Sequence, residues 1–207
     1  MRTASGDSNF HYSILITARM GSKVIGCKQG SNFDLWRIRL YPRRIMLKLP
    51  CTKSCFVCGT QNPIGLKLCF ETDGRTVKAR FTPQLVHAGF QGVVHGGIIS
   101  TLLDEIMVWA CCVNTRRFAY CAELNVRFAH PSHPGEEIIA TAQLTLNHRN
   151  KLFKARGELR NQHDLVLATA TGKYLALKDE DARIFLSDLD GDLGEIFSRL
   201  PQAIEPT

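Results

Sequence analysis

One stretch, from His95 to Cys112, constrains the fold more than any other part of the chain, because it predicts a single long helix. The apolar residues of this stretch recur at a spacing that places them on one helix face: Ile98, Ile99, Leu102, Leu103, Ile106, Trp109 and Ala110. The opposite face lacks the lysines and arginines of a solvent-facing stripe and carries Gly97, Ser100, Asp104, Val108 and Cys111. We therefore expect both faces of the helix to be covered.

The segments on either side of this helix predict strands. Before it, Val77, Ala79 and Phe81 alternate with polar residues, which is typical of a half-buried strand. After it, turn signals separate four long segments, which are 120–129, 136–148, 151–160 and 164–176. One long helix followed by several long antiparallel strands predicts an α+β fold, in which a curved antiparallel β-sheet wraps one long central helix.

Charge divides the chain of 207 residues into three parts, although its net charge is only +7. Residues 1–50 hold nine Lys and Arg against Asp7 and Asp34, whereas residues 179–207 hold eight acidic residues against two basic ones. We predict a basic N-terminal arm at 1–50, one folded domain at 51–178, and an acidic C-terminal tail at 179–207 that includes a short surface helix.

Composition also bears on location and partners. The arm before Met46 is an upstream-extended start or a targeting segment, with an extra structural element as a third reading. No stretch approaches the ~20 apolar residues of a membrane span, and the eight cysteines are not spaced like a disulfide scaffold. The body is mildly basic and lacks the usual signatures of nucleic-acid binding. We expect a cytoplasmic protein with reduced thiols, and no nucleic acid or membrane as its partner.

Two features of the predicted helix can support catalysis at a carbonyl group. Gly96 and Gly97 leave backbone N–H groups unshielded by Cβ at the positive end of the helix dipole, where they can stabilise an oxyanion. Asp104 can act as a general base for water or can attack the carbonyl itself. The neighbouring Glu105 lies about 100° round the helix and is expected to be a solvent-exposed or structural acid.

These two features lie too far apart on one helix to act together. At 1.5 Å rise per residue, Gly96 and Asp104 are ~12 Å apart, whereas both must approach one carbonyl carbon to within about 3 Å. Two antiparallel copies of the helix would place Asp104 of one chain opposite Gly96 of the other. The chemistry therefore predicts a homodimer with two equivalent composite sites.

Three blocks of the sequence carry a resemblance to a known family. They are "CFVCGTQNPIGLKLCF", "GFQGVVHGGIISTLLDE" and "AELNVRFAHPSHPGE", in that order. Together they resemble the hotdog-fold acyl-CoA thioesterases of the phenylacetate-degradation (PaaI) type, over residues 55 to about 178. The resemblance implies a hotdog fold, hydrolysis of an acyl-CoA thioester without a cofactor, and dimers that often pair into tetramers.

The resemblance also implies roles for individual residues. The amide of Gly96 would form the oxyanion hole, His95 and Gly97 would shape the turn around the acyl carbonyl, and Asp104 would be the catalytic carboxylate. His95 alternatively caps the helix by a hydrogen bond. Arg149 and Lys151, in a predicted turn between strands, would bind the coenzyme A phosphates.

The sequence departs from the family pattern at two positions. Gly89 stands where family members often have Asn, and Cys121 stands where they often have Ser or Thr, which are stronger hydrogen-bonding groups than a thiol. Gln91 or His87 could replace the missing Asn. These departures leave a second function open, a non-catalytic module of the same fold that binds an acyl-CoA or an acyl-carrier protein.

Cys51, Cys55 and Cys58 form a C-x3-C-x2-C pattern that three kinds of site could explain. Iron–sulfur ligands have this spacing in enzymes built on large partial α/β barrels, but the strand-rich pattern of this chain does not indicate such a barrel. A zinc site needs four ligands, so Cys69 or His87 would have to complete it. We favour inert thiols and expect no metal, since "CFVCG" itself recurs in the family.

Overall fold

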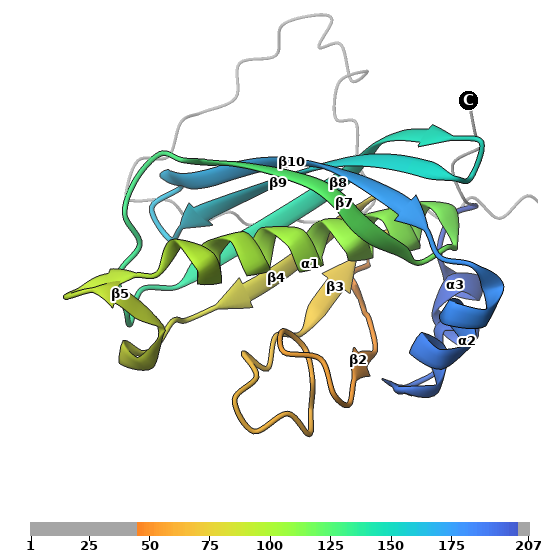
Figure 1. The fold of residues 1–207 in the computed structure, drawn as a ribbon, viewed down its shortest axis with the longest axis horizontal. Helices are drawn as coiled ribbons and strands as arrows, with labels where there is room; N and C mark the ends of the chain where they lie inside the picture. The colour runs from red at the N-terminus through yellow and green to blue at the C-terminus, as the bar shows by residue number, and fades with distance from the viewer. Residues whose placement is uncertain (1–44, 203–207) are drawn as a thin grey trace, which may run out of the picture. The chain divides into compact units, whose positions relative to one another are not determined.

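The computed structural model describes residues 45–202 and has an α+β fold, in which one antiparallel sheet curves around the long helix α1 (Gly96–Thr115), as predicted (Figure 1). All neighbouring strands in the seven-stranded sheet are antiparallel, and their order is β1 (Leu47–Lys48), β3 (Phe70–Thr72), β4 (Thr76–Phe81), β8 (Ile138–His148), β9 (Leu152–Asn161), β10 (Val166–Ala176) and β7 (Ala119–Phe128). The predicted strands are therefore confirmed. Residues 1–44, which hold most of the predicted basic arm, lie outside the described residues.

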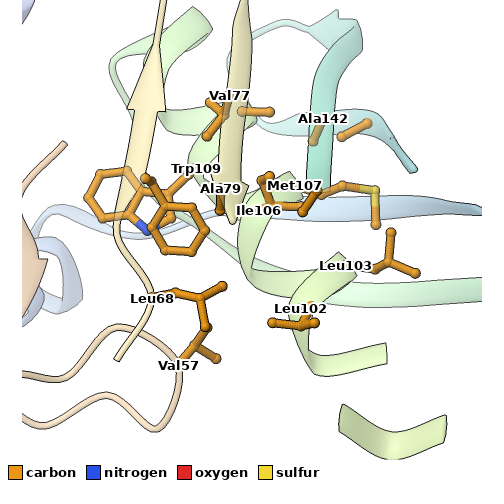
Figure 2. Packing of buried hydrophobic residues seen from close by; sticks show 14 of the residues in the cluster. Val57, Leu68, Val77, Ala79, Leu102, Leu103, Ile106, Met107, Trp109 and Ala142 are labelled. Carbon is orange, nitrogen blue, oxygen red and sulfur yellow. The ribbon is translucent and has the colours of Figure 1, made fainter. Parts of the chain in front are cut away.

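The core lies between α1 and the inner face of the sheet. Figure 2 shows Leu102, Leu103, Ile106 and Met107 of α1 packed beside Val77, Ala79 and Ala142 of β4 and β8. Val57 and Leu68, from the loop that precedes β3, extend the same core beside Trp109. The helix runs three residues beyond the predicted stretch and ends where Arg116 adopts a left-handed conformation, with φ 61°.

One expectation about α1 is wrong. No stretch of the sequence was expected to approach the length of a membrane span, yet α1 is long and apolar enough to cross a membrane by length and composition alone. More than half of its residues are buried inside this chain, Leu102, Leu103 and Ile106 completely. Helices buried in a protein core can have the same length and apolar composition, so α1 is only weak evidence for a membrane span.

The remaining elements close the two ends of the structure. At one end η2 (Leu85–His87) and the hairpin of β5 (Ala88–Phe90) and β6 (Val93–Val94) lead into α1. At the other end β2 (Cys51–Thr52) pairs with β11 (Leu189–Asp190). In the sequence, β11 lies between helices α2 (Asp179–Ser187) and α3 (Leu193–Arg199). Leu189 and Leu193 are buried, so the described part of the acidic segment after Lys178 packs on the body.

Candidate functional site

The N-terminus of α1 presents one unpaired backbone donor. His95 is the N-cap, and its Nδ1 accepts a hydrogen bond of 2.8 Å from the Gly97 N–H. The expectation of two free N–H groups is therefore wrong, because the capping role considered for His95 occupies one of them. No hydrogen bond of the described residues uses the Gly96 N–H as donor. This N–H is available to a ligand at the positive end of the helix dipole.

A groove lies directly in front of Gly96. Its volume is about 540 Å³, and its walls come from the β5–β6 hairpin, the start of α1 and the end of β7: Gly89, Phe90, Val93, Val94, His95, Gly96, Ile99, Phe128, Ala129, His130, Pro131, Ser132 and Leu167. Most of these residues are apolar, so the groove can take an apolar chain beside the free N–H. A larger hollow of about 700 Å³ lies on the outer face of the sheet, around Thr141 and Arg156, and contains none of the predicted site residues.

Asp104 lies half-buried on α1, on the side that faces the end of the sheet formed by β10 and β7. The Tyr174 hydroxyl donates a hydrogen bond of 3.2 Å to Asp104 Oδ1. Cys121 is paired with Tyr174 across the β7–β10 ladder, so both side chains point to the same face of the sheet. Burial and the nearby Asp104 carboxylate raise the pKa of Cys121 to about 11, so its thiol keeps a proton that it can donate at neutral pH.

Tyr174 is a site residue that was not predicted from the sequence. Its side chain is fully buried, and burial followed by the charge of Asp104 raises the pKa of its hydroxyl far above the usual range. Gly172 makes room for it, because a Cβ at that position would come within 2.6 Å of the Tyr174 ring. A glycine inside a strand, two residues before a tyrosine, was the one signal of this close approach in the sequence.

The residues proposed to replace the missing Asn do not face the groove directly. His87 Nδ1 accepts a hydrogen bond of 2.9 Å from the Gln84 N–H, and the His87 ring packs on Phe81. Gln91 is exposed at the β5–β6 turn and is not among the residues that line the groove. At Gly89 a Cβ would come within 2.9 Å of His95 Cδ2, so an Asn here would displace the capping ring.

Arg149 and Lys151 are exposed in the turn between β8 and β9, as predicted. The Lys151 carbonyl accepts a hydrogen bond from the Ala176 N–H. The next residue, Leu177, donates its N–H to the carbonyl of Phe118, which lies just beyond the C-terminus of α1. The turn therefore lies at the opposite end of α1 from Gly96 (Figure 1). Because Asp104 lies eight positions beyond Gly96 along a regular helix, one chain does not bring the oxyanion donor, the carboxylate and these basic side chains together.

The capping contact makes a stability prediction for a pair of variants. In Gly97→Ala the new Cβ would lie 2.8 Å from His95 Nδ1 and would push the ring off its cap. In Gly96→Ala it would meet only the Phe128 ring, at 3.4 Å, while the gain in helix propensity is similar. We expect Gly97→Ala to be less stable than Gly96→Ala by about 1 kcal/mol in urea denaturation. Equal stabilities would show that the cap contributes nothing.

Comparison with known proteins gives a family and a fold. The sequence model of one protein family, the thioesterase superfamily, matches residues 91–168. The medium/long-chain acyl-CoA thioesterase YigI of Escherichia coli (strain K12) is 30% identical over an alignment of 108 residues, which covers 45% of this chain and 68% of the relative.

Two solved structures share the fold. The crystal structure of a thioesterase superfamily protein has a TM-score of 0.55 at 24% identity; the match covers 58% of this chain and 59% of that one. The PaaI protein from the phenylacetic acid degradation operon of E. coli has a TM-score of 0.50 at 21% identity, over 55% of this chain and 81% of that one. With its hotdog fold and its relationship to YigI, the chain belongs to the thioesterase superfamily, a family of thioester hydrolases.

Proposed function

We propose that this protein hydrolyses an acyl-CoA to a free acid and coenzyme A, in a homodimer whose two sites each use residues of both protomers. The observation that carries the proposal is the unpaired Gly96 N–H, held at a helix N-terminus in the wall of an apolar groove. The relationship to an acyl-CoA thioesterase supports the same activity.

The proposed reaction begins with the thioester carbonyl placed against Gly96. The Gly96 N–H donates to the carbonyl oxygen and stabilises the negative charge that develops there when the carbon is attacked. Asp104 of the other protomer either takes a proton from the attacking water or attacks the carbon itself, giving an anhydride that water then opens. The carbon–sulfur bond breaks, and the thiolate of coenzyme A leaves and takes up a proton. Tyr174 positions the carboxylate of Asp104 through its hydrogen bond, and the Cys121 thiol lies on the same face of the sheet as Tyr174.

The exposed edge of β7 supports the proposed dimer. This ten-residue strand is the last in the sheet, and Tyr120 and Phe128 on it are 59% and 55% exposed. A long edge strand with apolar side chains is suited to pairing with a second copy. On α1, Ser100, Asp104 and Val108 are only half-buried by the described part of this chain, so an antiparallel α1 of the partner could cover them. The family resemblance extends this to pairing of dimers into tetramers.

Substrate binding would then use both ends of α1. The groove at Gly96 would hold the acyl chain, aliphatic or aromatic, against Ile99 and Phe128. In an antiparallel dimer the turn with Arg149 and Lys151 of one protomer approaches the end of α1 that carries Gly96 of the other. These exposed cations can bind the phosphates of coenzyme A there.

A non-catalytic acyl-CoA or acyl-carrier-protein binding module is the second candidate. Two observations favour it: Gly89 contributes no side chain beside His95, and Cys121 offers a thiol beside Asp104 where the family often has a hydroxyl. Binding without turnover by the wild-type protein would distinguish this module from the hydrolase.

Asp104→Asn tests the proposed role of the carboxylate. The change keeps the shape of the side chain and its contact with Tyr174 but removes the base or nucleophile, so we expect kcat to fall by about 10² to 10⁴ on a panel of acyl-CoA substrates with a thiol reporter. Asp164→Asn is the matched control, because Asp164 is exposed in the β9–β10 turn and should leave kcat unchanged. Unchanged kcat in Asp104→Asn, or no turnover of any substrate by the wild type, would overturn the proposed mechanism.

Tyr174→Phe tests whether the tyrosine positions Asp104. The ring and its packing remain while the hydrogen bond to Oδ1 is lost. A bond of this kind contributes about 1 to 1.5 kcal/mol, so we expect kcat to fall roughly tenfold with little change in KM. A loss of stability in urea denaturation with kcat unchanged would assign Tyr174 to packing alone.

A further inference from the structure

A cluster of three ionisable side chains lies away from the groove, on another side of α1. Cys55 and Cys58 come from the loop before β3, and Glu105 comes from α1. Their sulfur and carboxylate oxygen atoms all lie within 4.8 Å of one another, and Cys58 Sγ is 3.9 Å from Glu105 Oε1. Cys58 is buried, while Cys55 and Glu105 are half-buried. The fold therefore brings together residues that are almost fifty positions apart in the sequence.

The backbone of the loop is shaped around the two sulfur atoms. The Val57 N–H donates to Cys55 Sγ at 3.2 Å, and the Thr52 N–H donates to Cys58 Sγ at 3.5 Å. The Gly59 N–H donates to the Cys55 carbonyl at 2.9 Å, and a Cβ on Gly59 would lie only 2.1 Å from that oxygen, so the turn requires glycine. N–H groups directed at sulfur favour the thiolate form, which is the form that binds metals.

Val57 fixes this turn to the helix. It lies between the two cysteines in the sequence, and its buried side chain packs in the core that includes Trp109 (Figure 2). The sulfur atoms are thereby held against α1 at the level of Glu105. A site whose ligands are placed by packed elements does not depend on the ion for its arrangement.

The charges in the cluster are not balanced by basic side chains. Among the described residues, no Lys or Arg forms an ion pair with Glu105. The two thiols and the Glu105 carboxyl can each ionise to an anion, and Cys58 Sγ lies only 3.9 Å from Glu105 Oε1. Groups that ionise to anions and are buried together need a shared proton or a cation between them.

We propose that Cys55, Cys58 and Glu105 bind one zinc ion. Thiolate and carboxylate are both zinc ligands, with bond lengths of about 2.3 and 2.0 to 2.2 Å. The fourth ligand that a tetrahedral zinc ion needs would be a water molecule or the Thr52 hydroxyl, which lies 3.4 Å from Cys58 Sγ. Binding displaces the protons that the cluster holds. The ion would tie the loop to α1 at the residue next to Asp104, as a structural link that takes no part in the proposed hydrolysis.

This site differs from those weighed on the sequence alone. Glu105 supplies the ligand from α1 and is not a solvent-exposed acid. Cys51 points elsewhere, since its thiol donates to the Leu68 carbonyl at 3.7 Å. Neither Cys69 nor His87 belongs to the cluster. Glu105 could not be identified as a ligand from the sequence, because only the fold defines which residue of α1 faces the cysteine loop.

Zinc titration of the reduced full-length protein tests the proposal directly. After treatment with a chelator and its removal, we expect the protein to take up one zinc ion per chain in competition with a chromophoric chelator, and its melting temperature to rise. Cobalt in place of zinc should give the near-ultraviolet absorption of a thiolate-bound ion. No uptake at one equivalent together with an unchanged melting temperature would overturn the proposal. So would a Cys55–Cys58 disulfide in freshly purified protein that rejects zinc after reduction.

Variants assign the ligands. Cys58→Ser should abolish the cobalt absorption, and Glu105→Gln, which keeps the side-chain volume, should weaken zinc binding roughly tenfold or more. Cys69→Ser is the matched control, because Cys69 is exposed and outside the cluster, and it should bind like the wild type. Loss in Cys69→Ser equal to that in Cys58→Ser would contradict the assignment. Circular dichroism checks that each variant is folded, and none of these outcomes depends on acyl-CoA hydrolysis.

Discussion

The packing of α1 into the curved sheet is the interaction on which the other features of this protein depend. Three consecutive residues, about 100° apart on the helix, point into three different environments. Leu103 packs in the core, Asp104 meets Tyr174 at the β10–β7 side, and Glu105 meets the two cysteines of the loop. Because the helix is rigid and its register is fixed by burial, each of these contacts also fixes the other two.

The same rigidity explains why the proposed catalytic site needs two chains. The N-cap His95 accepts a hydrogen bond from the Gly97 N–H, so only the Gly96 N–H at the helix start remains for a ligand. Asp104 lies two turns further along a helix that cannot bend back. A helix that is well suited to hold either group is therefore unable to bring both to one carbonyl, and the exposed edge of β7 offers a surface for the second copy.

Much of the fold could be predicted because its signals are periodic. Helical spacing located α1, and alternation with turn signals located β4 and the four strands after α1. Contacts between distant segments could not be predicted in this way. Nothing local indicates that Tyr174 reaches Asp104 or that Glu105 faces Cys58, because both pairings depend on how strands and loop are aligned against the helix. The packing of Leu189 and Leu193 on the body was hidden by the acidic residues around them.

A mixed dimer tests the composite site most directly. Asp104→Asn lacks the carboxylate, and Gly96→Val fills the space in front of the oxyanion donor beside Phe128, so each variant alone is expected to be inactive. The two chains are co-expressed with different affinity tags, and dimers that carry both tags are purified. If the site spans two chains, these mixed dimers recover roughly half of the wild-type activity, because one of the two equivalent sites has both wild-type residues. Mixed dimers as inactive as their parents would contradict a site shared between protomers.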